Sequence, residues 1–483
     1  MVLSSPAGER MADGPRELEL GSETMRRMAE LAMDRIVEHI GSLPSQPASY
    51  DTSDGPDLAR SLAEGLPEQG SPFEELLALL FERVVPASFN TAGPGYLAYI
   101  PGGGLFHAAI ADLIADAVNR YVGVFQAAPG LAQIEANVVR WFSGIVGYPA
   151  AAGGFLTTGG SLANLSAVIT AREEKLGEAV TSGVVYVSDQ THHSVARAAR
   201  LAGIPPGRVR SLPGDESGRL DAGRLREAVA ADRRRGLRPF LVCGNAGTTN
   251  TGAVDDLEAL ACAAREEGLW LHVDAAYGGF FMLTERGRAR MKGIDQADSI
   301  TLDPHKGLFL PYGTGCLLAR DGGALRRTHA HHADYLPPMQ QDSGLVDFCD
   351  ISPELSRDAR GLRVWLPLKM HGAGAFRRSL DEKLDLAAWA AAELSAIPGV
   401  DVVAPPQLSL LAFRLSRPGR PREEMDRLNR SVLERVNAGG RVFLTGAVLP
   451  SGFVLRICVL SFRTHADRMR EAIDAVRQAA SEV

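Results

Sequence analysis

The chain has few cysteines, and the five among its 483 residues lie far apart, at Cys243, Cys262, Cys316, Cys349 and Cys458. Because no two form a CxxC pair and the number is odd, the sequence predicts neither a disulfide framework nor a zinc–cysteine site. No apolar run approaches the roughly 20 residues of a membrane span. The N-terminus lacks the basic stretch and apolar core typical of a signal peptide. We therefore expect a cytoplasmic protein without a membrane segment.

An excess of positive charge is also missing, since 51 Lys and Arg residues stand against 58 Asp and Glu, for a formal net charge of −7. A surface for nucleic acid or anionic membrane needs clustered basic residues. The densest basic run, residues 232–235, is more typical of a solvated helix end. Hydrophobic residues make up 45% and charged residues 23% of the chain, which is ordinary for a globular protein. The composition therefore favours a small molecule as the partner over nucleic acid or membrane.

The first hundred residues predict a tail and two helices. Residues 1–20 are polar and small, as in a loose terminus. Apolar residues recur at helical spacing over 22–40, with Ser22 placed as the N-cap and Gly41 and Pro44 placed to end the helix. Residues 41–70 are rich in Pro, Gly and Ser and indicate a linker, and a second helix is expected at about 72–84. We assign residues 1–104 to an N-terminal tail and helical dimerisation segment.

From about residue 105, short β-rich runs alternate with helical stretches. We expect strands at 184–188, 239–244, 269–274, 299–303 and 316–319, and helices at 161–173, 192–202, 221–233 and 255–267. This alternation is typical of an α/β fold, with a mostly parallel sheet covered on both faces. Ligands of such sheets bind at the carboxyl ends of the strands. We expect a large domain over 105–361 and a smaller α+β domain over 362–483.

Two charged residues lie at or just after the ends of expected strands. Lys306 ends the segment SITLDPHK, between His305 and Gly307, and a lysine amine can form a Schiff base with a carbonyl compound. Asp274 ends the buried segment LWLHVD, where a carboxylate needs a cationic partner. That partner is a protonated pyridine nitrogen in one interpretation and an arginine or a helix end in the other. Ala276 is small enough for a flat ring to rest against it.

Three further segments end at the same edge. The turn TTGGSLAN holds Gly160 and Ser161 at a helix start, where backbone N–H groups bind phosphate well. His192 follows the run VVYVSDQT and is able to stack on a planar group, although a surface histidine is the commoner case. Thr248, in GNAGTT, has a hydroxyl that either reaches a ligand or stabilises the turn.

The glycine-rich turn, His192, Thr248, Asp274 and Lys306 follow one another along the chain in this order, and HVDAAY, DPHK and QDSGL are the most specific segments. With this pattern the chain resembles the group II pyridoxal-phosphate-dependent amino-acid decarboxylases from about residue 90 onward. The resemblance implies fold type I, the aspartate-aminotransferase-like fold, with pyridoxal 5'-phosphate (PLP) as cofactor. It implies Lys306 as the Schiff-base lysine and Asp274 as the partner of the pyridinium nitrogen. It further implies that the cofactor contacts Gly160, Ser161, His192, Thr248, Ala276, Asp303 and His305. Asp303 occupies a position that is Asn in some relatives.

The long segment at about 321–360 lacks periodicity, and a loop of this length is often functional. The resemblance implies that Tyr335, shortly before QDSGL, lies on a mobile loop and reprotonates the substrate carbon after CO2 leaves. Relatives with Phe there tend to form aldehydes by an oxidative route. Arg360 matches an arginine that helps to hold the closed site and binds substrate. His329, His331 and His332 have no carboxylate or cysteine set to complete a metal site, so we expect no metal.

The substrate segment PGYLAYIP places Tyr99, Ile100 and Pro101 where the aromatic-amino-acid decarboxylases have their pocket, although Gly102 departs from the Thr common there. The segment 121–127, YVGVFQA, would line the pocket from the partner subunit of a homodimer and has no Arg or Lys for a second carboxylate. We therefore expect decarboxylation of an aromatic or apolar L-amino acid. An acidic or sulfur-containing substrate, an aldehyde-forming activity and a non-catalytic binding protein remain the alternatives.

Overall fold

The computed structural model describes residues 17–331, 342 and 344–483, and these fall into two compact units. The smaller unit comprises residues 17–46 and 50–89 and contains helices α1 (Ser22–Ser42), α2 (Gly55–Ser61) and α3 (Phe73–Leu79), followed by a π-helical turn at Leu80–Val84. Ion pairs join Arg27 to Glu74 at 2.9 Å and Arg35 to Glu82 at 3.3 Å. None of the residues of α1 or α2, all of which the structure describes, is buried.

Three details of this unit correct the sequence prediction. The N-cap of α1 is Gly21 and not Ser22, and no side chain caps the helix. The helix continues through Gly41 to Ser42, because a glycine near a helix end lowers helix stability without breaking the backbone hydrogen bonds. The expected linker at 41–70 contains α2, whose start has a proline at one of its first positions, a place where proline suits a helix.

The larger unit contains a seven-stranded sheet in the order β1-β7-β6-β5-β4-β2-β3. Its strands are β1 (Gly153–Thr157), β2 (Gly183–Ser188), β3 (Val209–Leu212), β4 (Arg238–Asn245), β5 (Trp270–Asp274), β6 (Ser299–Leu302) and β7 (Gly315–Ala319). β7 runs antiparallel to both of its neighbours, β1 and β6, and the other neighbouring strands pair in parallel. The mostly parallel sheet is therefore confirmed, while β1 and β3 were missed, because β1 opens with two glycines and β3 has only four residues.

Helices cover both faces of this sheet. The helices in contact with its strands are α5 (Pro129–Val146), α6 (Gly160–Leu176), α7 (His193–Leu201), α8 (Ala222–Arg234), α9 (Leu257–Glu266), α11 (Pro304–Gly307) and α12 (Gly322–His329). Two more helices, α4 (Phe106–Val118) and α10 (Glu285–Arg290), pack on other helical segments. Alternate residues of β2 enter different cores: Val184 and Tyr186 belong to one, and Val185 and Val187 to the other. Because both faces are buried, polar side chains concentrate at the strand ends.

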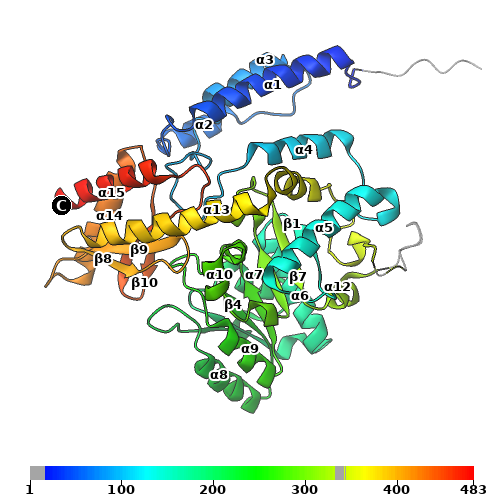
Figure 1. Ribbon diagram of the computed structural model, residues 1–483, viewed down its shortest axis with the longest axis vertical. Helices are drawn as coiled ribbons and strands as arrows, with labels where there is room; N and C mark the ends of the chain where they lie inside the picture. The colour runs from blue at the N-terminus through cyan, green and yellow to red at the C-terminus, as the bar shows by residue number, and fades with distance from the viewer. Residues whose placement is uncertain (1–16, 332–341, 343) are drawn as a thin grey trace, which may run out of the picture. The chain divides into compact units, whose positions relative to one another are not determined.

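A second, four-stranded antiparallel sheet has the order β10-β11-β9-β8. It consists of β8 (Val400–Ala404), β9 (Leu410–Leu415), β10 (Thr445–Leu449) and β11 (Gly452–Cys458), with helices α14 (Arg422–Ala438) and α15 (Ala466–Ser481). Leu411, Val432, Ile457 and Val476 share a separate core. The long helix α13 (Gly361–Ser395), broken at Gly372, runs from the helices of the large sheet to this smaller sheet (Figure 1). The expected α+β region is confirmed, and its boundaries stay a prediction.

Candidate active site

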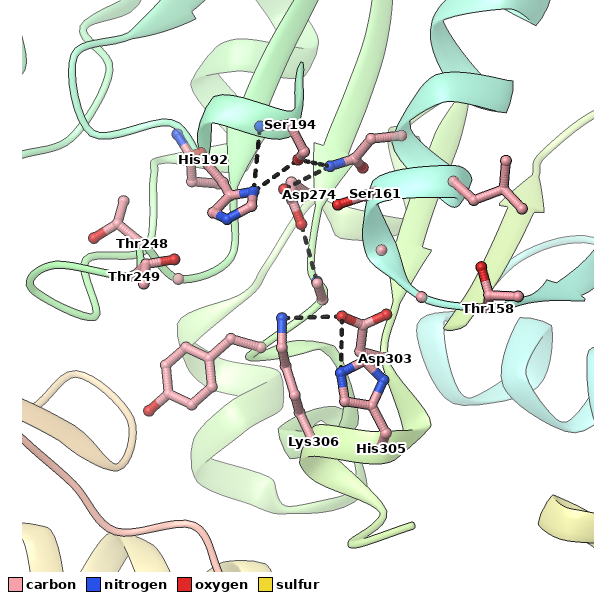
Figure 2. Close-up of a pocket in the computed structure, with 18 residues that line it drawn as sticks. Thr158, Ser161, His192, Ser194, Thr248, Thr249, Asp274, Asp303, His305 and Lys306 are labelled. Carbon is pink, nitrogen blue, oxygen red and sulfur yellow. Dashed lines mark hydrogen bonds and ion pairs between the residues drawn. The ribbon is translucent and has the colours of Figure 1, made fainter. Parts of the chain in front are cut away.

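A cavity of about 290 Å³ opens at the carboxyl ends of the parallel strands. The turn between β1 and α6 contributes to its wall, as do the segments that follow β2, β4, β5 and β6. All nine residues expected to contact the cofactor line it: Gly160, Ser161, His192, Thr248, Asp274, Ala276, Asp303, His305 and Lys306. Figure 2 shows Lys306 and Asp303 on one side of this space, and His192 and Asp274 across it.

Lys306 is held by an acidic neighbour. It lies in the short helix α11, and its Nζ is 2.9 Å from Oδ2 of Asp303. Burial alone would lower the pKa of Lys306, but the carboxylates of Asp303 and Asp274 outweigh burial and raise that pKa. Among the described residues, Oδ1 of Asp303 has no hydrogen-bond partner although it is buried. The amine is therefore held as a protonated group paired with Asp303.

Asp274 is almost entirely buried, and two donors fix its carboxylate. Oδ2 accepts a hydrogen bond from Nδ2 of Asn164 at 2.9 Å, and Oδ1 accepts one from the backbone N–H of Ala276 at 3.2 Å. Asp274 ends β5 at the central part of the sheet. A buried carboxylate at a cavity wall attracts a cationic group of a ligand, because the surrounding protein screens its charge poorly.

His192 is the N-cap of α7, and its ring is fixed by the next turn. Nδ1 accepts from the backbone N–H of Ser194 at 3.3 Å and lies 2.7 Å from the Ser194 hydroxyl. Burial lowers the pKa of His192, and the positive charge that Asp274 favours does not offset this effect. The ring is therefore neutral at pH 7. With Nδ1 accepting, the proton is on Nε2.

The glycine-rich turn leaves no space for a side chain at Gly160. A Cβ there would lie 2.9 Å from Oδ2 of Asp303 and 3.3 Å from Cβ of Ala276. Gly160 is the first residue of α6, a helix of 17 residues. The N-terminal N–H groups of such a helix and its dipole attract an anion. The turn therefore combines close backbone approach with a suitable phosphate environment.

Two other wall residues are engaged with their own loops. The Thr248 hydroxyl is 2.8 Å from that of Thr251 and accepts from the backbone N–H of Ala253 at 3.1 Å, so it stabilises the turn as well as facing the cavity. His305 donates from Nδ1 to the carbonyl of Thr314 at 2.6 Å. This bond turns Nε2 of His305 towards Asp303, at 3.7 Å.

The four residues expected to bind substrate do not line this cavity. Tyr99 is 54% exposed, and Ile100 is buried in the core of the large sheet. Pro101 is also buried, in the segment that leads to α4. Arg360 pairs with Glu354 at 2.7 Å and with Asp358 at 2.6 Å. Tyr335 and His332 lie outside the described residues, and among the described residues no group of three His, Cys, Asp or Glu side chains is placed to hold a metal.

Sequence reasoning missed several residues at the site. Asn164 was part of the TTGGSLAN motif but had no assigned role, although it is one helical turn after Gly160 and therefore on the same face of α6. Tyr277, in HVDAAY, lines the cavity, and its hydroxyl accepts from the backbone N–H of Ser409 at 2.9 Å. Ser194 contacts both His192 and Asn164. No sequence pattern indicated the bonds from Asn164 to Ser194 and from Ser409 to Tyr277, because the partners are 30 and 132 residues apart in the chain.

Comparison with known proteins agrees with this architecture. Residues 56–416 match the family described as pyridoxal-dependent decarboxylase conserved domain. The chain is 36% identical to an aromatic-L-amino-acid decarboxylase of Bacillus atrophaeus, over 96% of this chain and 97% of that protein. It is 30% identical to tryptophan decarboxylase 1 of Oryza sativa subsp. japonica, over 99% and 97% of the two chains.

Solved structures give the same result. The crystal structure of Oryza sativa TDC with PLP and tryptamine superposes with a TM-score of 0.91, at 29% identity, over 96% of this chain and 99% of that chain. Rhodiola rosea 4-hydroxyphenylacetaldehyde synthase superposes with a TM-score of 0.89 at 26% identity, over 96% and 99% of the two chains. Among the described residues, no helix is long and apolar enough to cross a membrane. The fold is that of the fold type I PLP enzymes, and the chain belongs to the pyridoxal-dependent decarboxylase family, as a PLP-dependent carboxy-lyase that acts on an amino acid.

Proposed function

We propose that this protein decarboxylates an aromatic L-amino acid to the amine and CO2. The observation that carries the proposal is the cavity in which Lys306, Asp274 and His192 meet the glycine-rich turn. The substrate class rests on the similarity to an aromatic-L-amino-acid decarboxylase along 96% of the chain. It rests also on the apolar segment 121–127, which has no cationic side chain for a second carboxylate.

The cavity residues fit PLP chemically. Gly160 has no room for a Cβ, so its backbone can approach a ligand closely at a helix start suited to phosphate. Asp274 is a buried carboxylate suited to a protonated ring nitrogen. The buried Oδ1 of Asp303 has no partner among the described residues and can accept a further hydrogen bond. Gly160, Ser161 and His305 would hold the phosphate, and Asp274, Ala276 and His192 the ring.

Each of these residues then has a distinct task. Bound PLP supplies a conjugated ring that accepts the electron pair released as the carboxylate leaves. Lys306 would hold the cofactor through its ε-amine. Asp274 keeps the ring nitrogen protonated, because a carboxylate at this position favours the positive charge. His192 would stack on the ring with its proton on Nε2, and Thr248 would offer its hydroxyl from the cavity wall.

Tyr335 and Arg360 form the second part of the proposal. Tyr335, which lies outside the described residues, would donate the proton that the substrate α-carbon takes up after CO2 leaves. Arg360, held by Glu354 and Asp358, steadies the segment that follows this loop. Tyr335→Phe should shift the product from amine towards aldehyde, CO2 and ammonia, with one O2 consumed and one peroxide formed per turnover.

That shift is measured by quantifying amine, aldehyde, ammonia and peroxide for the best substrate. Tyr148→Phe is the matched control, because it removes a buried tyrosine hydroxyl outside the cavity, which donates to the carbonyl of Ala297 at 2.9 Å. It should leave the amine as the product. If the Tyr335→Phe variant still forms the amine at the wild-type rate, Tyr335 is not the proton donor.

A homodimer and a cytoplasmic location complete the proposal. Large apolar side chains are exposed on α1, α3 and α4, at Met25, Val37, Leu76, Leu113, Ile114 and Val118. Exposed apolar side chains of this kind favour a protein interface, and a twofold partner would bring the segment 121–127 to the site of the other subunit. All five cysteines are free, as in a reducing compartment. Active protein that sediments as a monomer would contradict the dimer.

An amino-acid panel tests the activity directly. The holoenzyme is incubated with aromatic, acidic, sulfur-containing and branched L-amino acids, and CO2 and amine are measured. We expect aromatic substrates to be preferred, and Lys306→Ala to abolish both turnover and the visible absorbance of bound PLP. Lys292→Ala, which changes an exposed lysine, is the control and should keep both. A preference for glutamate would overturn the substrate class, and no binding of PLP by the wild-type protein would favour a non-catalytic role.

A further inference from the structure

A chain of buried hydrogen bonds leads from β5 and β6 to Asp274. It begins at the indole of Trp270, whose Nε1–H donates to the Ser299 hydroxyl at 2.8 Å. Oγ of Ser299 is 2.9 Å from Nδ1 of His272, and Nε2 of His272 is 3.0 Å from Oδ1 of Asn164. The side chains of Ser299, His272 and Asn164 are each at most 1% exposed, so solvent does not compete for these bonds.

The direction of this chain follows from its two ends. An indole N–H can only donate and a carboxylate can only accept, so Ser299 accepts from Trp270, and Asn164 donates its amide N–H to Asp274. The oxygen of Asn164 is then left to accept from His272, whose Nδ1 accepts from the Ser299 hydroxyl. Nε2 of His272 then carries the ring proton and donates to Asn164. Burial lowers the pKa of His272 from 6.5 to about 4, which agrees with a neutral ring. Thr301 also donates to Oδ1 of Asn164, at 2.6 Å.

Two donors on its oxygen determine which way the Asn164 amide faces. Its NH2 group therefore points to the active site, where Nδ2 donates to Oδ2 of Asp274 and to Oγ of Ser194, both at 2.9 Å. Ser194, having accepted from Asn164, donates its hydroxyl proton to Nδ1 of His192 at 2.7 Å. Figure 2 shows these bonds where they meet Asp274, Ser194 and His192.

We propose that Asn164 is a positioning residue that prepares two cofactor contacts at once. Through one N–H it orients the Asp274 carboxylate as an acceptor for the ring nitrogen. Through the other, with Ser194 as relay, it keeps His192 neutral with its proton on Nε2, facing the cavity. The roles of Asp274 and His192 in this inference rest on the proposed function. The role of Asn164 depends on an amide, because a carboxylate of the same shape lacks the two donors.

Asn164→Asp tests this role by replacing the donor that faces Asp274 with an acceptor. Two carboxylates this close share a proton at moderate pH, because their like charges repel. We expect the dissociation constant for PLP, measured by equilibrium titration of absorbance, to rise roughly 10- to 100-fold at pH 8. The ratio of variant to wild type should fall towards 1 as pH decreases, because the shared proton restores a donor. The other titratable groups that face Asp274 are His192, His272, Lys306 and Cys243.

Two further variants distinguish the positioning role of Asn164 from a general loss of structure in helix α6. Thr170→Val removes a buried hydroxyl from the same helix, where it bonds to the carbonyl of Ser166 at 2.8 Å, and should leave the PLP dissociation constant within twofold. Asn164→Ser removes the amide without adding charge, and should weaken PLP binding about tenfold at every pH. If Asn164→Asp does not fold, Asn164→Ser decides the question.

The inference is overturned if Asn164→Ser binds PLP as tightly as the wild-type protein. It is equally overturned if Asn164→Asp weakens binding by a ratio that does not change with pH, since that would indicate damage to the helix alone. Failure of the proposed function would look different, because the wild-type protein itself would then not take up PLP through Lys306.

Discussion

A buried ion pair between Glu135 of α5 and Arg357 supports the strand that leads to the glycine-rich turn. Oε1 of Glu135 is 2.7 Å from Nη2 of Arg357, and their side chains are 2% and 0% exposed. Both residues bond to Leu156, the next-to-last residue of β1: Glu135 accepts from its N–H at 3.1 Å, and Arg357 donates to its carbonyl at 3.0 Å. Since β1 is an edge strand, these side chains replace a neighbouring strand there.

Glu135→Gln keeps the shape of this contact and removes the negative charge. The Coulomb attraction at 2.7 Å is about 6 kcal/mol at an effective dielectric constant of about 20. Desolvation offsets part of it, but the variant leaves the cost of the buried guanidinium uncompensated. Two of its nitrogens, Nε and Nη1, already have no partner among the described residues. We therefore expect a loss of about 3–5 kcal/mol in the free energy of unfolding.

The measurement is urea unfolding of the protein without added PLP, followed by tryptophan fluorescence, for Glu135→Gln, Arg357→Met and the double variant. The double variant should be about 2 kcal/mol more stable than the sum of the single effects predicts, because the two groups interact directly. Arg327→Gln breaks a pair with Glu174 in which Arg327 is 55% exposed, and should cost at most about 1 kcal/mol. Equal effects of Glu135→Gln and Arg327→Gln would refute the reasoning.

Two other predictions concern the cavity and the buried histidine. Gly160→Ala should weaken PLP binding at least tenfold, because its Cβ would press on Asp303 and Ala276, whereas Gly144→Ala, with no atom within 4 Å of the added Cβ, should not; equal PLP affinities in a binding titration would contradict this. Burial lowers the pKa of His272 from 6.5 to about 4, so the unfolded chain binds the proton more readily between these pH values. The contribution of His272 to the free energy of unfolding is therefore complete well above pH 6.5, and it decreases by about 3 kcal/mol as the pH falls to 4. His272→Gln should flatten that part of the stability–pH curve, and an unchanged slope in unfolding titrations would exclude His272 as its cause.

The position of the site was largely determined by the sequence. Lys306, Asp274, His192 and Thr248 each follow a run of apolar, β-rich residues, and the carboxyl ends of parallel strands meet at one edge. The local pattern of each strand therefore sufficed to predict which side chains would gather there. Strands without such a pattern were missed, as with the glycine-led β1 and the short β3.

Only the tertiary structure decided how these side chains are held. Asn164 and Asp274 are 110 residues apart, and Glu135 and Arg357 are 222 residues apart. Hydrogen bonds and ion pairs of this kind leave no periodic signal in a sequence, because each requires only one suitable side chain at each end. Their strength comes from burial, which depends on how the sheet and helices pack. The chain thus determines locally where its reactive groups lie, whereas long-range packing decides their charge, tautomer and orientation.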